Sequence, residues 1–127
     1  MDQSKLKYLP SHEWADIHGN VCTVGITQYA VDQLTDVTHL QLPKVGAAVT
    51  AGTPFGEIES VKAVFDLNAP VTGTVAEKND AVEKDPSLIN QDPYGKGWMI
   101  KIKVASGAKT DHLLDLQQYE KQLAEGH

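Results

Sequence analysis

Residues 56–70 read Gly56-Glu57-Ile58-Glu59-Ser60-Val61-Lys62-Ala63-Val64-Phe65-Asp66-Leu67-Asn68-Ala69-Pro70, and this stretch decides the fold. On both sides of Lys62, small or apolar residues alternate with polar ones, which is the period-two pattern of a β-strand. Pro70 ends the second strand. We therefore predict two short strands joined by a tight turn that presents the Lys62 amine at its tip. Such an amine is a candidate attachment point for a swinging cofactor.

The same stretch also has a simpler interpretation as a surface hairpin. Taken alone, Lys62 would be an ordinary solvated lysine. Glu57, Glu59 and Asp66 would then be the polar faces of edge strands. The hairpin pattern does not decide between the two interpretations, so other parts of the chain must.

The composition is that of a globular protein, and we expect one domain over residues 1–127. The net charge of −6 argues against a nucleic-acid-binding protein, which would present a basic face. No run approaches the ~18–20 apolar residues of a membrane span, and we see no secretory or transit segment. We expect a cytoplasmic protein, although a mature mitochondrial form fits the same sequence. Cys22 is the single cysteine, which leaves no intrachain disulfide and suggests a buried thiol.

The N-terminal part predicts short strands around a buried tryptophan. We expect a strand from Lys5 to Leu9, and we expect Trp14 to fill the core while Ser11 and Glu13 stay near the surface. Gly19-Asn20 is a turn signal, so residues 14–17 and 21–26 should form a hairpin. Thr27 should cap a short helix that ends near Leu34.

The middle of the chain carries a weak internal repeat. A strand is expected from Val37 to Leu42. Residues 45–49 and 71–75 each set a glycine between valines ahead of a polar turn, at residues 50–53 and 77–80, one on each side of the Lys62 hairpin. Two similar halves suggest a flattened β-barrel or sandwich.

The C-terminal part predicts two helices and one strand. Asp85 should cap a single helical turn that begins at Pro86 and runs through Asn90. Residues 98–104 alternate strictly and give the clearest strand of the chain. Asp115 and Gln118 have the spacing of a capping box, which predicts a terminal helix. The sum is a mostly β protein with three short helices.

Residues that could carry catalysis by themselves are not grouped in the sequence. The five histidines are scattered, and none has a metal-ligand spacing such as H-x3-H. We find no GxSxG elbow, no Walker A loop and no GxGxxG before a helix. A self-contained enzyme would need a nucleophile and a base that the sequence does not offer. We therefore predict a protein that is not an enzyme and holds no metal.

The run Glu59-Ser60-Val61-Lys62-Ala63 resembles the lipoyl-attachment motif of the glycine cleavage system H-protein family. The resemblance extends in order along nearly the whole chain. Further matching segments are Ser11-His12-Glu13-Trp14, residues 24–30, residues 54–64, residues 69–73, residues 88–98, and Leu113-Leu114-Asp115 with Tyr119. Biotin carriers instead set their lysine between methionines, and lipoyl domains of 2-oxoacid dehydrogenases usually have Asp where Val61 stands.

The resemblance implies a fold and a function. The fold would be a lipoyl/biotinyl-type hammerhead, a flattened β-barrel or sandwich with its core at about residues 21–105. An N-terminal strand segment, short helices and a C-terminal helix would extend it. The protein would be a non-catalytic carrier with lipoate in amide linkage to Lys62. Glu59, Ser60, Val61 and Ala63 would flank the attachment site.

By resemblance, the arm would carry an aminomethyl group between enzymes. Its partners would be the pyridoxal-phosphate glycine decarboxylase (P protein), the tetrahydrofolate-dependent aminomethyltransferase (T protein) and dihydrolipoamide dehydrogenase (L protein). A lipoyl ligase or an octanoyl or lipoyl transferase would attach the lipoate, and we expect a monomer. Ser11, Glu13 and Asp66 would hold the loaded arm in a cleft. The alternative is an H-like protein that relays lipoyl groups to another lipoyl-dependent system.

Three residues depart from the pattern of the family. Thr35 stands where the family usually has glycine, so the exit from the preceding helix is expected to differ slightly. Gln41 replaces a frequent acidic residue. Phe65 replaces a small hydroxyl residue and is expected to alter packing beside the arm.

Overall fold

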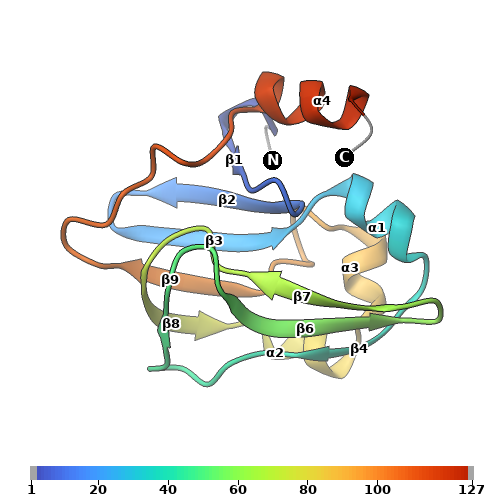
Figure 1. Cartoon of the computed structure of the whole chain (residues 1–127). Helices are drawn as coiled ribbons and strands as arrows, with labels where there is room; N and C mark the ends of the chain where they lie inside the picture. The colour runs from blue at the N-terminus through green and yellow to red at the C-terminus, as the bar shows by residue number, and fades with distance from the viewer. Residues whose placement is uncertain (1–2, 126–127) are drawn as a thin grey trace.

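The computed structural model describes residues 3–125, which form two antiparallel β-sheets with short helices at their edges (Figure 1). The larger sheet has the strand order β1-β2-β3-β9-β8-β5, and the smaller one has the order β4-β6-β7. The strands of the larger sheet are β1 (Lys7–Tyr8), β2 (Glu13–His18), β3 (Val21–Ile26), β9 (Ile100–Val104), β8 (Gly73–Lys78) and β5 (Ala48–Val49). Those of the smaller sheet are β4 (Val37–Gln41), β6 (Pro54–Ser60) and β7 (Val64–Asn68).

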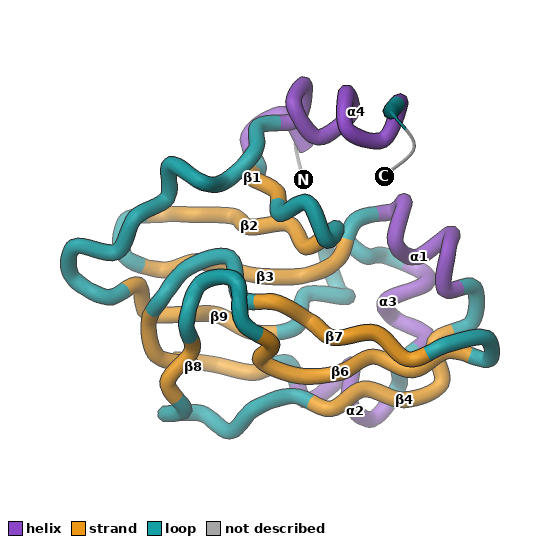
Figure 2. Tube along the Cα trace, in the orientation of Figure 1, coloured by secondary structure: helices purple, strands orange, loops and turns teal. Residues whose placement is uncertain are grey.

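Across the described residues 3–125, five short helical segments accompany the sheets. They are a 3₁₀ turn (Gln3–Lys5), α1 (Gln28–Leu34), α2 (Asp80–Lys84), α3 (Ser87–Gln91) and α4 (Leu116–Ala124). Figure 2 shows α4 over the β1–β2 end of the larger sheet, away from the β6–β7 hairpin. Within residues 3–125, no helix has the length and apolar character needed to cross a membrane.

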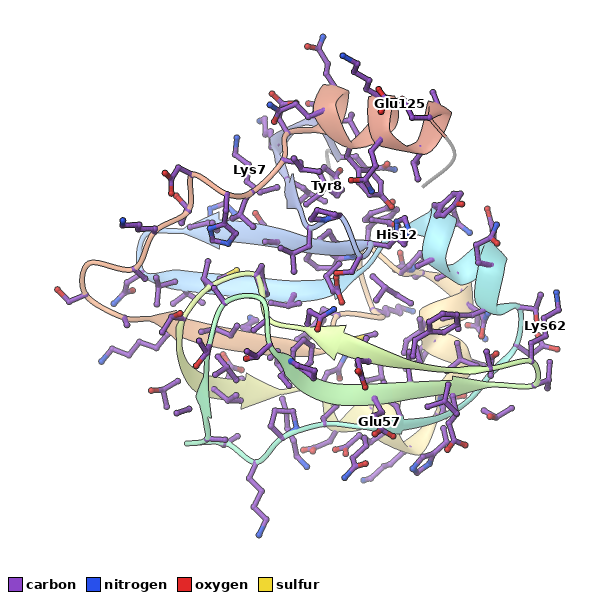
Figure 3. The ribbon with its side chains drawn as sticks, in the orientation of Figure 1. Lys7, Tyr8, His12, Glu57, Lys62 and Glu125 are labelled. Atoms are coloured by element: carbon purple, nitrogen blue, oxygen red, sulfur yellow. The ribbon has the colours of Figure 1, made fainter. Side chains whose placement is uncertain are left out.

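The predicted hairpin at Lys62 is confirmed. Strands β6 and β7 pair antiparallel with Glu59 opposite Val64 and Ile58 opposite Phe65. The hairpin projects beyond the sheet edge, and Lys62 lies at its outer end (Figure 3). Gly56 permits the neighbouring strand β4 to approach closely, because a Cβ at this position would lie 2.2 Å from the carbonyl oxygen of Gln41.

The predicted N-terminal hairpin is also confirmed, with Gly19 in the left-handed region (φ 61°) at the turn between β2 and β3. Trp14 is fully buried, as expected. Its indole N–H donates to the carbonyl of Pro93 at 3.0 Å. The ring fits because residue 25 is glycine: a Cβ there would lie 2.5 Å from the Trp14 ring. The strand predicted over residues 5–9 is shorter, because the 3₁₀ turn occupies its start.

The two segments of the internal repeat pair directly with each other. Strand β5 lies antiparallel to β8, with Ala48 opposite Thr74. The Gly46 amide donates to the Val75 carbonyl at 2.8 Å, and the Val75 amide donates to the Ala47 carbonyl at 2.9 Å. The repeat therefore closes one end of the larger sheet, as a flattened sandwich requires.

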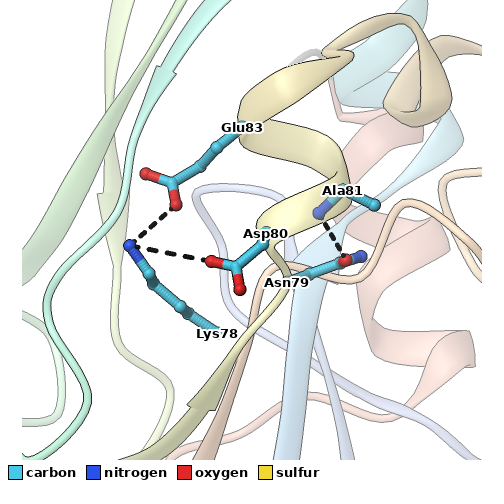
Figure 4. A network of polar contacts seen from close by, with 5 residues as sticks. All are labelled: Lys78, Asn79, Asp80, Ala81 and Glu83. Atoms are coloured by element: carbon cyan, nitrogen blue, oxygen red, sulfur yellow. Dashed lines mark hydrogen bonds and ion pairs between the residues drawn. The ribbon is translucent and has the colours of Figure 1, made fainter.

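Residues 77–80 were expected to be a polar turn, and this prediction is wrong because α2 begins at Asp80. The Asn79 side chain accepts from the Ala81 amide at 3.2 Å and caps the helix (Figure 4). Lys78 reaches across to Glu83 at 2.8 Å and to Asp80 at 3.9 Å. A five-residue helix buries too few side chains to show a helical period in the sequence.

The prediction that Asp85 caps the next helix is wrong by one residue. Pro86 occupies the N-cap position of α3 and offers no side-chain hydrogen bond. Asp85 instead accepts from the Ser87 amide at 3.2 Å. The terminal helix is confirmed, because Asp115 and Gln118 form the complete capping box of α4.

Thr35 ends α1 in a conformation that suits glycine. Thr27 caps the helix as predicted, but Thr35 has φ 61° and ψ −131°, a region that β-branched residues rarely adopt. This strain explains physically why glycine is the expected residue here.

Thr35→Gly is expected to raise the free energy of unfolding by about 1 kcal/mol, because relief of the strain outweighs the entropy that glycine adds to the unfolded chain. Urea denaturation measures the change directly, and the midpoint of thermal unfolding should rise by roughly 3–5 °C. Thr35→Ala is the matched control, since its Cβ retains most of the strain. Equal effects of the two substitutions would contradict the explanation.

Candidate functional site

The tip of the β6–β7 hairpin is a two-residue turn organised by Ser60. The Ser60 amide donates to the Ala63 carbonyl at 2.9 Å. The Ser60 hydroxyl accepts from the amides of Lys62 and Ala63, both at 3.2 Å. One hydroxyl thus satisfies two turn amides, which is the role of serine in such turns. The exposed Lys62 side chain consequently extends from an ordered backbone.

The tip is also tied to the body of the protein. The Val61 amide donates to the carbonyl of Asp36 at 3.3 Å. The segment around Asp36 is held by Asn90 of α3, whose side chain accepts from the Val37 amide at 3.0 Å and donates to the Thr35 carbonyl. Helix α3 therefore supports the backbone against which the lysine turn rests.

Apolar side chains surround the lysine on the surface. Val61 is 68% exposed, Val64 56% and Phe65 50%. These three residues lie next to Lys62 in the hairpin, whereas most large apolar residues of the chain are buried. Phe65 was expected to alter packing beside the arm, and its ring lines the cleft that begins here.

A cleft of about 450 Å³ runs between the hairpin, helix α1 and the loop before β2. Its apolar wall includes Ile58, Phe65 and Leu34, and its polar end comes from residues 11–13, where the loop before β2 leads into the strand. A wall of this kind fits an alkyl chain, and the polar end fits a charged or hydrogen-bonding head. The lysine and the cleft together are suited to an amide-linked arm with an apolar body.

The structure brings Ser11, Glu13 and Asp66 to the lining of this one cleft. Their role in holding a loaded arm stays a prediction. The motif flanks occupy the hairpin: Glu59 is half-buried opposite Val64, and Ala63 closes the turn. Among residues 3–125, no three His, Cys, Asp or Glu side chains gather where they could hold a metal ion.

Glu13 was expected near the surface, and this prediction is wrong because its side chain is 1% exposed. The carboxylate accepts from the Ser11 hydroxyl on one oxygen and from the Asn68 amide at 2.7 Å on the other. Burial raises the pKa of the Glu13 carboxyl, and the two hydrogen bonds oppose that shift. These bonds join the β2 strand to β7, so the buried acid ties the cleft together.

His12 is a cleft residue that the search for chemistry in the sequence did not single out. Its Nδ1 lies 2.7 Å from the Tyr119 hydroxyl, which in turn lies 2.7 Å from the Thr27 hydroxyl. These three residues come from a loop, α4 and the cap of α1. No sequence pattern links positions so far apart, although His12 is part of the matched Ser-His-Glu-Trp segment.

Comparison with known proteins adds independent findings. The profile of the family described as "Glycine cleavage H-protein" matches residues 6–126. A glycine cleavage system H protein of Carboxydothermus hydrogenoformans is 49% identical over 120 residues, covering 94% of this chain and 92% of that protein. The Nostoc punctiforme protein of the same name is 46% identical over 92% of this chain and 91% of its own length.

A solved structure is similar as well. The crystal structure of a glycine cleavage system H protein from Mycobacterium marinum superposes with a TM-score of 0.87 at 39% identity. The match covers 95% of this chain and 98% of that one. The resemblance and the mostly β fold predicted from the sequence are both confirmed.

Proposed function

Because the chain belongs to the glycine cleavage H-protein family, we propose that it carries lipoate on Lys62 and shuttles an aminomethyl group in the glycine cleavage system. Members of this family are non-catalytic lipoyl carriers, so the chain is a carrier component and not an enzyme. The observation that carries the proposal is the exposed Lys62 on an ordered turn next to an apolar cleft. The lipoyl group would supply a cyclic disulfide that is reduced as it takes up the cargo.

The chain itself would contribute presentation and protection. Ser60 and the Asp36 carbonyl fix the turn, so the ligase meets an amine whose backbone does not need to be ordered first. The cleft would shelter an aminomethyl cargo from water. Ser11, Glu13 and Asp66 would hold its ammonium, because hydrogen bonds to charged groups are stronger than neutral ones.

We propose as partners the P, T and L proteins of the system, together with a lipoyl ligase or an octanoyl or lipoyl transferase. The carrier would act as a monomer and as one domain over residues 1–127. The relatives reported above are bacterial, which supports a cytoplasmic location.

A loading assay tests the proposal. Lipoylated protein is mixed with glycine decarboxylase and glycine, and the intact mass of the carrier is followed. We expect an aminomethyl adduct on the arm and its disappearance when aminomethyltransferase and tetrahydrofolate are added. Lipoylation without loading would favour the alternative, in which the protein relays lipoyl groups to another system.

Ser60→Ala is expected to slow lipoylation several-fold with little loss of stability. The variant removes the acceptor of the Lys62 and Ala63 amides, and water can replace it at this exposed turn, so the cost is about 1 kcal/mol or less. Initial rates of mass gain with a lipoyl ligase measure the effect. Ser60→Thr retains the hydroxyl and should keep the rate of the wild type; equal slowing by both variants would argue against a role for the hydroxyl.

A further inference from the structure

A hydrogen-bonded network of three side chains, Tyr119, His12 and Thr27, links the C-terminal helix to the cleft. The Tyr119 hydroxyl lies 2.7 Å from His12 Nδ1 and 2.7 Å from Thr27 Oγ1. Tyr119 is 3% exposed, and its ring stacks on Tyr8 with centroids 4.7 Å apart. Packing therefore holds the Tyr119 hydroxyl, the central group of this network, in place.

The imidazole of His12 is fixed on one edge and open on the other. Its ring packs 4.7 Å from Tyr29 and meets Tyr119 edge-on at 5.7 Å. The residue has φ 83°, in the left-handed region, and it lines the cleft (Figure 3). Within residues 3–125, Nε2 has no hydrogen-bond partner, and since no fully buried polar side-chain atom there is left without one, Nε2 is not fully buried. Because His12 lines the cleft and its Nδ1 is already bonded, Nε2 is the ring nitrogen left for a cleft ligand.

The direction of these hydrogen bonds decides whether His12 Nε2 donates or accepts. If Thr27 donates to Tyr119 and Tyr119 donates to Nδ1, the proton of the ring sits on Nε2. If His12 instead donates from Nδ1 and Tyr119 donates to Thr27, Nε2 presents a lone pair. Thr27 can accept this bond together with the 3.3 Å bond from the Ala30 amide, because a hydroxyl oxygen accepts two. When the Thr27 and Tyr119 hydroxyl groups reverse and the ring proton moves to Nδ1, His12 Nε2 therefore changes from a donor to an acceptor.

We propose that His12 Nε2 is a further acceptor for the ammonium of the aminomethyl cargo, and that Tyr119 and Thr27 stabilise the acceptor tautomer of the imidazole once the ammonium binds. The inference rests on the proposed function. An alkylammonium has only donors, so it selects the tautomer with the proton on Nδ1. Burial lowers the pKa of His12, which favours the neutral ring that such an acceptor needs. Helix α4 thereby contributes to the cleft through Tyr119, a positioning residue.

The consequence is protection of the cargo. Hydrolysis consumes one water and returns the thiol, formaldehyde and ammonium, and expulsion of the thiolate needs the nitrogen lone pair. Hydrogen bonds to the ammonium keep that lone pair protonated. Each acceptor in the cleft should therefore slow hydrolysis.

Two amide variants separate the two edges of the imidazole. In His12→Asn, the side-chain amide occupies the place of Nδ1 and keeps the hydrogen bond to Tyr119, but no atom replaces Nε2. Asparagine also tolerates the positive φ at this position. In His12→Gln, the amide reaches the place of Nε2. We expect the adduct to hydrolyse roughly ten- to a hundredfold faster in His12→Asn, the factor of about one hydrogen bond to a charged group. His12→Gln should recover part of the protection, and His18→Asn, at an exposed histidine, is the control.

The adduct is prepared without any partner enzyme, from the reduced lipoylated protein with formaldehyde and ammonia, and its decay is followed by intact mass. Nitrogen chemical shifts of the His12 ring give a second readout, and loading should move the proton to Nδ1. Tyr119→Phe should abolish this tautomer change while the fold is retained, as monitored by circular dichroism.

The outcomes are distinct. Equal hydrolysis rates in wild type and His12→Asn, or an unchanged tautomer on loading, would overturn the inference and leave the carrier function intact. A wild-type chain that is never lipoylated would overturn both.

Discussion

Lys62→Ala is expected to abolish completely the mass increase that the wild-type chain acquires when it is co-expressed with a lipoyl ligase and supplied with lipoate. The amide forms on this amine, and no neighbouring lysine occupies the ordered turn. Because the side chain is exposed, its removal should change the free energy of unfolding by no more than about 0.5 kcal/mol. Loss of modification would then reflect loss of the acceptor and not of the fold.

Lys44→Ala is the matched control, since Lys44 is also exposed but lies outside the hairpin. It should be lipoylated like the wild type. An unmodified wild-type chain, or a Lys62→Ala chain that still gains the lipoyl mass, would remove Lys62 from the proposed function. Peptide mapping of any chain that gains the lipoyl mass identifies the acceptor.

Local features of the fold could be predicted because each depends on neighbouring residues. Alternation around Lys62 predicted the hairpin, Gly19-Asn20 predicted a turn, and the Asp115 capping box predicted α4. Each signal lies within a few positions of the structure it specifies. By contrast, α2 depends on Asn79, whose amide also donates to the carbonyls of Lys96 and Trp98 at 2.9 Å and 2.7 Å. Those partners cannot be read from a five-residue helix.

The candidate site likewise contains a local part that the sequence could predict and a long-range part that it could not. Lys62 and its flanks form one continuous stretch, so the sequence could present them together. The burial of Glu13 depends on the backbone amide of Asn68, 55 positions away. The orientation of the His12 ring depends on the Tyr119 hydroxyl, 107 positions away. Charge alone suggests that a glutamate lies near the surface, and only the paired strands reveal that this one is enclosed.

Substitution of Glu13 should separate its structural role from its charge. Glu13→Ala leaves the Asn68 amide without its buried partner and should lower the free energy of unfolding by about 2 kcal/mol. Glu13→Gln can still accept from Asn68 and reach Ser11, so it should fold at least as stably at neutral pH. Urea denaturation of the two variants provides the comparison, and equal destabilisation would contradict this account.

The pH dependence of stability follows from the same burial. Because the pKa of Glu13 is raised in the folded state, the folded chain binds this proton more tightly than the unfolded chain does. The contribution of Glu13 is therefore fully present below the ordinary value of 4.5, declines as pH rises through the folded pKa, and is constant above it. The stability profile of Glu13→Gln should lack this decline, so the difference between the wild-type and variant profiles should show it.

Glu13→Gln is then the variant in which the fold is retained and the charge is lost, and it should expose an aminomethyl cargo to water. Replacing a carboxylate acceptor by a neutral amide weakens a hydrogen bond to an ammonium by about 1.5–3 kcal/mol, or roughly ten- to a hundredfold in hydrolysis rate. Lipoylation of Lys62 should be unchanged, because Glu13 bonds the backbone amide of Asn68, at the end of β7 opposite the lysine turn. Decay of the adduct measured by intact mass gives the answer. Identical rates in wild type and Glu13→Gln would assign Glu13 to the structure of the cleft alone and leave the protection to Asp66, Ser11 and His12.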